Sequence, residues 1–191
     1  MRSRPETLAK PDAPDRGRIT GFAPVVGSDS RILILGSMPS VASLERQQYY
    51  GLPRNAFWPI MAGLFGVPAD QPYERRLAAL VKNRIALWDV IHSCRRPGSL
   101  DSSIESDSVE PNDFGHLFRA QPGIVRVFFN GRKAEQMFDR LVKPRCAEAA
   151  SRDFTTLPST SPAHAAMSFA EKLERWAVVS RDVGPANREM R

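Results

Sequence analysis

The stretch Arg31-Ile32-Leu33-Ile34-Leu35-Gly36 decides the fold, because it is a continuous apolar run that stops at a glycine. A run of this length without polar alternation is typical of a strand buried on both faces of a parallel sheet. Three further segments are strand candidates: residues 85–88, ending at Asp89; residues 124–129, ending at Asn130; and residues 153–157, ending at Pro158. The sequence therefore predicts four strands.

Helical patterns lie between and after these strands. Apolar residues recur every three or four positions over residues 55–65, 73–83, 131–141 and 168–177. Ser168 stands three residues before Glu171, the spacing of a capping box at the start of the last helix. The alternation predicts an α/β fold, a three-layer sandwich with a central four-stranded parallel sheet covered by helices on both faces. Its ligand cleft is expected beyond the carboxyl ends of the strands.

The chain of 191 residues has the length of one globular domain. Its 42% hydrophobic and 25% charged residues are near the averages for folded proteins, which argues against wholesale disorder. We expect a flexible basic tail over residues 1–18, a single domain over 19–180 and a C-terminal tail over 181–191. Residues 95–111 are rich in Ser, Asp, Pro and Gly and predict a long loop beside the cleft.

Charge and cysteine content narrow the function classes. The 27 Lys and Arg against 21 Asp and Glu give a formal net charge of +6, which favours a polyanionic partner such as nucleic acid. The two cysteines, Cys94 and Cys146, are too few for a four-thiolate metal site, and we expect reduced thiols and no metal. No apolar run predicts a signal peptide or a membrane span, so we expect a cytoplasmic protein. The phosphate-loop and dinucleotide-binding glycine motifs are absent from the sequence.

Three segments carry polar or aromatic groups to the expected cleft. The turn Gly36-Ser37-Met38-Pro39-Ser40 can aim N–H groups and a hydroxyl at a ligand, although a plain strand-ending turn is the alternative. Residues 47–58 read QQYYGLPRNAFW; Phe57 and Trp58 open a helix as core anchors, whereas Tyr49 and Tyr50 lie where a ring can stack on a base. Residues 158–164 read PSTSPAH and offer three hydroxyls suited to phosphates, with a capped turn as the alternative.

Taken in this order, the three segments resemble the uracil-DNA glycosylase superfamily, specifically its hypoxanthine-DNA glycosylase branch, over roughly residues 31–179. The resemblance implies a four-stranded parallel sheet with a DNA site at the strand ends. It also implies an enzyme that flips a deaminated deoxynucleotide out of DNA and hydrolyses its N-glycosidic bond, leaving an abasic site. No cofactor is expected, and the expected partner is DNA containing a deaminated base. We expect a monomer that associates with the nucleoid when it acts.

The sequence departs from the better-known uracil enzymes at two positions. Met38 stands where they carry an Asp or Asn that positions water, and Leu157 stands where many carry a His. In the hypoxanthine branch the asparagine of the PRNxFW segment is implicated instead, which transfers to Asn55. Its carboxamide oxygen would accept a water hydrogen while its NH2 is held by neighbours, and a helix N-cap is a compatible alternative.

The resemblance assigns recognition of the flipped base to two residues of this sequence. Tyr50 falls where mismatch-specific relatives place the ring that stacks on the flipped base. Asp89 falls where uracil enzymes hold a base-reading Asn; a carboxylate only accepts, so it could take N1–H of hypoxanthine, which adenine lacks. A helix or turn cap is the equal alternative for Asp89.

The remaining assignments complete the predicted site. Asn130 either fixes the base or water or caps the next helix, and His164 either donates to a phosphate or the leaving base or is an ordinary surface residue. The catalytic candidates are Asn55, Asn130 and His164; the base-binding candidates are Ser37, Met38, Pro39, Tyr50, Phe57 and Asp89; the DNA-binding candidates are Arg54, Ser159, Thr160, Ser161 and Pro162. Arg95, Arg96, Arg132 and Lys133 are further candidates for backbone contacts.

The sequence thus predicts a monofunctional glycosylase that removes hypoxanthine from deoxyinosine in base excision repair. One alternative keeps the reaction and changes the base to uracil or another deaminated base. A second alternative is a noncatalytic DNA-binding module, for which Met38 is the best argument. A zinc deaminase is set aside because its H-x-E and P-C-x-x-C elements are absent.

Overall fold

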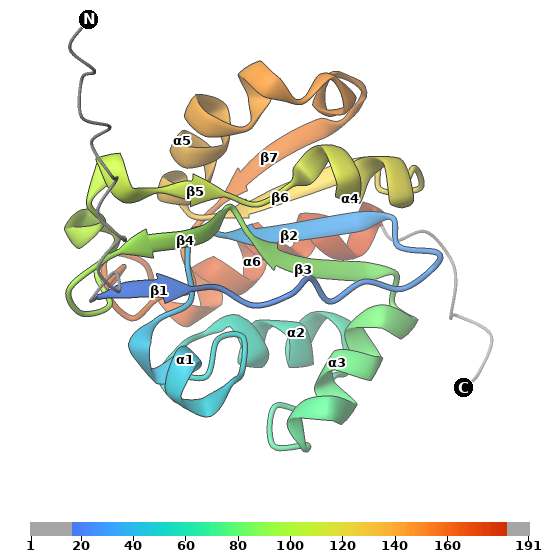
Figure 1. Ribbon diagram of the computed structural model, residues 1–191. Coiled ribbons are helices and arrows are strands. Elements are labelled where there is room, and N and C mark those ends of the chain that lie inside the picture. Colours follow the sequence, from blue (N-terminus) through green and yellow to red (C-terminus); the bar gives the residue numbers. More distant parts are fainter. Residues whose placement is uncertain (1–16, 183–191) are drawn as a thin grey trace, which may run out of the picture.

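The computed structural model describes residues 17–182 and has a parallel four-stranded sheet at its centre (Figure 1). Its strands lie in the order β3 (Ile85–Asp89), β2 (Ile32–Gly36), β6 (Arg126–Asn130) and β7 (Asp153–Leu157). All four predicted strands are present; β6 begins two residues later than expected. The pairs Gly36 with Asp89 and Asn130 with Leu157 bring the carboxyl ends of the strands to one edge. The predicted fold class is confirmed.

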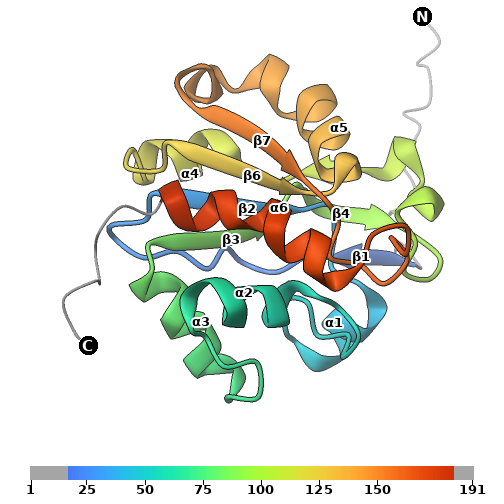
Figure 2. The same ribbon diagram turned by 180° about the vertical axis from the view of Figure 1, so that it is seen from behind.

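Aromatic side chains attach helices to both faces of this sheet. On one face, Phe57 of α2 (Phe57–Phe65) meets Trp176 of α6 (Phe169–Asp182) edge to face, with ring centroids 6.1 Å apart. On the other face, Trp88 and Phe129 contact Phe114 of α4 (Phe114–Ala120) and Phe138 of α5 (Arg132–Leu141), respectively. Figure 2, seen from behind, shows α6 lying across the near face of the sheet. The three-layer sandwich follows from strands that are apolar on both sides.

Of the remaining elements, only α3 was predicted, because the others carry weaker sequence signals. A second, antiparallel sheet has the order β1 (Arg18–Thr20), β4 (Ile91–Arg95) and β5 (Glu110–Pro111). Helix α1 (Val41–Arg46) follows β2, and the predicted α3 (Tyr73–Lys82) precedes β3. Short 3-10 helices are η1 (Asp101–Ser103), η2 (Ser106–Ser108), η3 (Lys143–Arg145) and η4 (Ala147–Ser151). The segment predicted as one long loop therefore contains η1, η2 and β5.

The ends of the domain differ slightly from expectation. The predicted N-terminal tail lies outside the described residues up to residue 16, while Arg18 pairs with Arg95 in the small sheet. Helix α6 runs to Asp182, five residues beyond the prediction, and the rest of the predicted C-terminal tail lies outside the described residues. The Ser168–Glu171 capping box is confirmed, since Glu171 N–H donates to Ser168 Oγ and Ser168 N–H to Glu171 Oε2.

Three observations bear on the excluded classes. Between residues 17 and 182, no helix combines the length and apolarity that a membrane span requires. Within the same residues, no three His, Cys, Asp or Glu side chains gather as a metal-binding group. Cys94 and Cys146 are both buried and both free thiols, and burial raises the pKa of each.

Candidate active site

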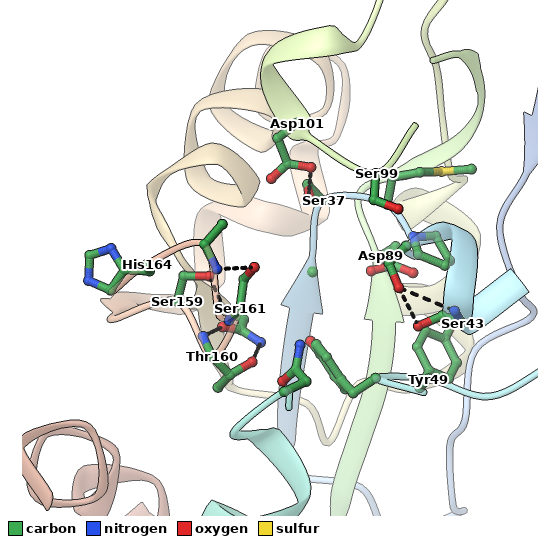
Figure 3. A pocket seen from close by; sticks show the side chains of 18 of the residues that line it. Ser37, Ser43, Tyr49, Asp89, Ser99, Asp101, Ser159, Thr160, Ser161 and His164 are labelled. Atoms are coloured by element: carbon green, nitrogen blue, oxygen red, sulfur yellow. Dashed lines mark hydrogen bonds between the residues drawn. The ribbon is translucent and has the colours of Figure 1, made fainter. Parts of the chain in front are cut away.

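A cavity of about 300 Å³ opens at the carboxyl edge of the sheet (Figure 3). Most predicted site residues line it: Ser37, Met38, Pro39, Tyr50, Asn55, Asp89, Asn130, Ser159, Thr160, Ser161 and His164. Three do not line it, namely Arg54, Phe57 and Pro162. The cavity thus brings together residues that are more than 120 positions apart in the sequence.

Asp89 holds a carboxylate at the buried end of the cavity. It is the last residue of β3 and pairs with Gly36 of β2, so the register of the sheet fixes its position. A Cβ on Gly36 would overlap Asp89 Oδ1, which makes glycine necessary there. Burial, reinforced by the negative charge of Asp101 and opposed by Arg96, raises the pKa of Asp89 to about 7. An ionised Asp89 is therefore costly in the free protein.

The Asp89 carboxylate has an oxygen with nothing to bind. Among the described residues, Oδ2 is buried and has no hydrogen-bond partner. No capping hydrogen bond from the Asp89 side chain is found in residues 17–182; only its backbone carbonyl accepts one, from Asn112 Nδ2 at 2.9 Å. A buried acceptor without a donor is expensive, so a ligand that supplies an N–H gains the full value of that bond.

Tyr50 forms a wall of the cavity, and the backbone of the preceding residue, Tyr49, is anchored by two hydrogen bonds. Tyr49 N–H donates to Tyr73 Oη at 2.8 Å, and Trp58 Nε1–H donates to Tyr49 O at 3.0 Å. Tyr50 itself has φ = 54°, a left-handed conformation that is rare for a residue with a side chain and clusters at functional sites. Its ring stacks on Phe57 with centroids 3.9 Å apart and planes 21° from parallel. Its hydroxyl is buried without a partner within the described chain.

Two aromatic assignments need correction. Phe57, predicted to bind the base, is fully buried beneath Tyr50 and does not line the cavity, because it opens α2 toward the core. Tyr49 is 3% exposed and its hydroxyl donates to Ala23 O at 3.1 Å. Tyr49 therefore is not free to stack on a ligand, and Tyr50 is the ring that remains.

Asn55 lines the cavity and also caps a helix, so the two interpretations coexist. Its Oδ1 accepts the Phe57 N–H at 3.0 Å at the start of α2. The oxygen is thus held by a neighbour; within residues 17–182 no hydrogen bond from the NH2 group is found, so the predicted hold on that group stays a prediction. A carboxamide oxygen has two lone pairs, so Oδ1 retains one acceptor site for water.

Asn130 binds a neighbouring loop with both ends of its amide. Its Nδ2 donates to Thr160 Oγ1 and its Oδ1 accepts Thr160 N–H, each at 2.8 Å. Asn130 does not cap α5: the N-cap position is Gly131, and no side-chain hydrogen bond caps the helix there. Thr160 was predicted to grip phosphate, but it is 1% exposed and its hydroxyl and N–H are both used by Asn130. Both residues instead position the loop.

The rest of residues 158–164 forms a turn that also lines the cavity. Ser159 Oγ accepts Ser161 N–H at 3.2 Å, and Ser161 Oγ accepts Ala163 N–H at 3.3 Å. Both hydroxyls therefore serve the turn as acceptors, while their hydrogens can still be donated. His164 lies at the outer edge of the cavity, across Ser159 from Asp89 (Figure 3).

A further wall of the cavity comes from the predicted long loop, whose position the sequence indicated only as beside the cleft. Residues 96–101, here called the strap, bind the turn after β2 at three points. Arg96 Nη2 donates to Pro39 O at 2.5 Å, Val41 N–H donates to Ser99 Oγ at 2.9 Å, and Ser37 Oγ donates to Asp101 Oδ1 at 2.8 Å. The sequence predicted a loop beside the cleft, but no local signal marked which strap residues enter it: Ser99, Leu100 and Asp101.

The strap also changes the list of DNA-contact candidates. Arg96 is 5% exposed and donates to backbone carbonyls, so it cannot reach a phosphate as predicted. Arg95 pairs with Glu105 at 2.7 Å. Arg54 is exposed next to the cavity-lining Asn55.

The cavity combines the Tyr50 ring, which can stack on a base, with the buried acceptor Asp89 Oδ2. This combination suits an enzyme that acts on a base flipped out of the double helix. Comparison with known proteins defines that class as DNA glycosylase. The family model of the Uracil DNA glycosylase superfamily matches residues 23–180, and the chain belongs to this superfamily. The predicted family is confirmed, and the noncatalytic alternative loses its support.

Individual relatives agree with this placement. The chain is 39% identical over 162 residues to a protein of Methanosarcina acetivorans named hypoxanthine DNA glycosylase, a match that covers 84% of this chain and 97% of the relative. A protein of the same name from Methanosarcina barkeri is 39% identical over 115 residues, covering 60% of this chain and 72% of that protein. A solution NMR structure from M. acetivorans, described as a candidate uracil DNA glycosylase, superposes with a TM-score of 0.73 at 36% identity, covering 88% and 99% of the two chains.

Proposed function

We propose that this DNA glycosylase removes hypoxanthine from deoxyinosine in DNA, leaving an abasic site for base excision repair. The observation that carries the proposal is the buried, partnerless Asp89 Oδ2 in a cavity walled by Tyr50. The relatives named hypoxanthine DNA glycosylase support the same substrate.

The chemistry of Asp89 favours a base that carries a ring N–H. Hypoxanthine offers N1–H to the ionised carboxylate, whereas adenine has only a lone pair at N1 and would leave the charge unpaired. A site built around a hydrogen bond rejects an analogue that lacks the donor strongly, because its own polar group is then stranded. Asp89 thereby separates the deaminated purine from its normal parent.

The other roles follow from the positions described above. Tyr50, backed by Phe57, stacks on the flipped base, a contact worth about 1–3 kcal/mol. Asn55 Oδ1 orients the attacking water with its second lone pair. Ser37, Met38 and Pro39 form a further part of the cavity wall.

DNA contacts are assigned to groups around the mouth of the cavity. Ser159 and Ser161 donate hydroxyl hydrogens to phosphates, and Pro162 keeps their turn stiff. Arg54 contacts the backbone, and His164 donates to a phosphate at the rim. Thr160 is left out of this set because Asn130 occupies it.

Uracil is the second candidate base, because its N3–H between two carbonyls presents the same donor to Asp89. The test measures abasic-site formation, revealed by alkaline cleavage, on otherwise identical duplexes that contain inosine, uracil, xanthine or adenine. We expect the highest single-turnover rate with inosine and none with adenine. A higher rate with uracil would reassign the substrate, and no excision of inosine would refute the proposal.

A second experiment addresses the role of Asn55. The variant Asn55→Ala should lose about 10²-fold or more in single-turnover rate, the scale of a group that orients a reacting water, while it still binds inosine-containing DNA. Asn83→Ala is the matched control, since Asn83 also bonds a helix end through its side chain but lies at the far end of α3. Equal rates for Asn55→Ala and the control would contradict the assignment.

A further inference from the structure

The cavity contains a second carboxylate that the assigned roles leave unused. Asp101 begins η1 on the strap and lines the same cavity as Asp89. Its Oδ1 accepts the Ser37 hydroxyl at 2.8 Å, which fixes the direction of the carboxylate. Figure 3 shows Asp101 and Asp89 on opposite sides of Ser37. Two negative groups held in one hollow are costly to fold, so each needs a reason to be there.

Hydrolysis of a glycosidic bond needs a group that accepts a proton from the attacking water. Asn55 can orient the water, but a carboxamide does not take up a proton near neutral pH. Asp89 is committed to the base, and the thioether side chain of Met38 does not take up a proton near neutral pH. His164 lies at the outer edge of the cavity, beyond Ser159 (Figure 3). Among the cavity-lining residues, this leaves Asp101 as the base.

We propose that Asp101 is a catalytic residue, which accepts a proton from the attacking water and places negative charge near the deoxyribose as the bond to the base breaks. This inference rests on the proposed function. The water oxygen forms a bond to the anomeric carbon while the carbon–nitrogen bond breaks and its electron pair leaves with the base. Asp101 takes one water proton and later releases it to solvent, and the departing base anion takes up a proton from solvent.

The surroundings of Asp101 suit this role. Burial raises the pKa of Asp101, which makes its carboxylate a stronger proton acceptor. The Ser37 hydroxyl and the positive charges of Arg96 and Lys133 oppose that rise and favour the ionised form. Asp89 faces it from β3 and Lys133 from α5. The same negative charge stabilises the positive, oxocarbenium-like sugar in the transition state.

The variant Asp101→Asn tests charge and basicity with little change of shape. Its amide oxygen still accepts the Ser37 hydroxyl, so the strap stays attached. With an inosine duplex under single-turnover conditions, we expect a rate loss of about 10²-fold or more and a Kd for uncleaved DNA within twofold of wild type. Asp107→Asn is the matched control, because Asp107 lies in η2, a few residues beyond the strap, with its side chain 83% exposed. This variant should keep the wild-type rate. A rate for Asp101→Asn within twofold of wild type would overturn the proposal, as would a loss of DNA affinity as large as the loss of rate.

Chemical rescue supplies an independent readout. In Asp101→Ala, added formate should restore part of the lost rate, because it can enter the space of the missing carboxylate and accept the proton. A structural role in the strap predicts no response to formate, and that result would also overturn the proposal. These outcomes differ from a failure of the proposed function itself, in which the wild-type protein would not excise hypoxanthine from the inosine duplex.

Discussion

Replacing Asp89 by asparagine should stabilise the free protein above neutral pH and lower the rate of inosine excision, because the neutral amide oxygen accepts the base N–H more weakly than a carboxylate does. The structural reason is the cost of a buried charge without a partner, expressed as a pKa raised from 3.8 to about 7. Each pKa unit corresponds to about 1.4 kcal/mol, so ionised Asp89 lowers the free energy of unfolding by up to about 4 kcal/mol. The asparagine NH2 also needs a partner, at a cost of about 1–3 kcal/mol, which reduces the expected gain to between about 1 and 3 kcal/mol.

The sign of the effect depends on pH. Below about pH 4 both the folded and the unfolded protein carry a protonated Asp89, and there is no penalty. Between pH 4 and 7 the unfolded chain releases the proton while the folded protein keeps it, so stability falls as pH rises. Above pH 7 the penalty is complete. The advantage of Asp89→Asn over wild type must therefore grow from pH 4 to pH 8.

Guanidinium unfolding of both proteins at several pH values between 4 and 8 measures this difference. Comparison with wild type cancels the pH dependence of groups that do not interact with Asp89. Asp107→Asn is the control, because its exposed side chain carries no burial penalty. If the stability difference between Asp89→Asn and wild type is the same at pH 4 and pH 8, or if the variant is less stable at pH 8, the argument from the buried charge is refuted.

Three further predictions test the supports of the site. Gly36→Ala should lower inosine excision by about 10²-fold or more, since its Cβ displaces the Asp89 carboxylate that carries base recognition; a single-turnover assay checks this. Asn130→Ala should lower the free energy of unfolding by about 1–3 kcal/mol, measured by denaturant, and speed amide exchange in residues 159–161, because Thr160 loses two partners. Tyr50→Ala should weaken binding to an inosine duplex by about 1–3 kcal/mol in a titration, the value of one stacking contact.

The parallel sheet could be predicted because its strands are buried and nearly free of polar residues. Residues 32–35 have no exposed surface, and an uninterrupted apolar run is the sequence signal for that environment. Strand β4, Ile-His-Ser-Cys-Arg, mixes polar and apolar residues and gives no such signal. Helix α1 has only six residues, too few for a helical period to be recognised.

The site was predictable where the chain order of the strands determines position. Asp89 and Asn130 end the parallel strands β3 and β6 on either side of β2, so their meeting at one edge follows from the topology. Which way an individual side chain turns does not follow from it: Thr160 faces Asn130 rather than DNA, and Phe57 lies beneath Tyr50. Asp101 escaped detection because the path of the strap through space, and no local pattern, brings it to Ser37.

The two carboxylates are anchored in mechanically different ways. Asp89 is embedded in the register of a central sheet, whereas Asp101 arrives on a short connection that contacts the core through a few hydrogen bonds. Selectivity and turnover are therefore separable targets for an engineer. Mutant libraries confined to residues 96–101 would vary the reaction rate without changing the residues that bind the base. A new base preference would demand coordinated changes in the adjacent strands β2 and β3.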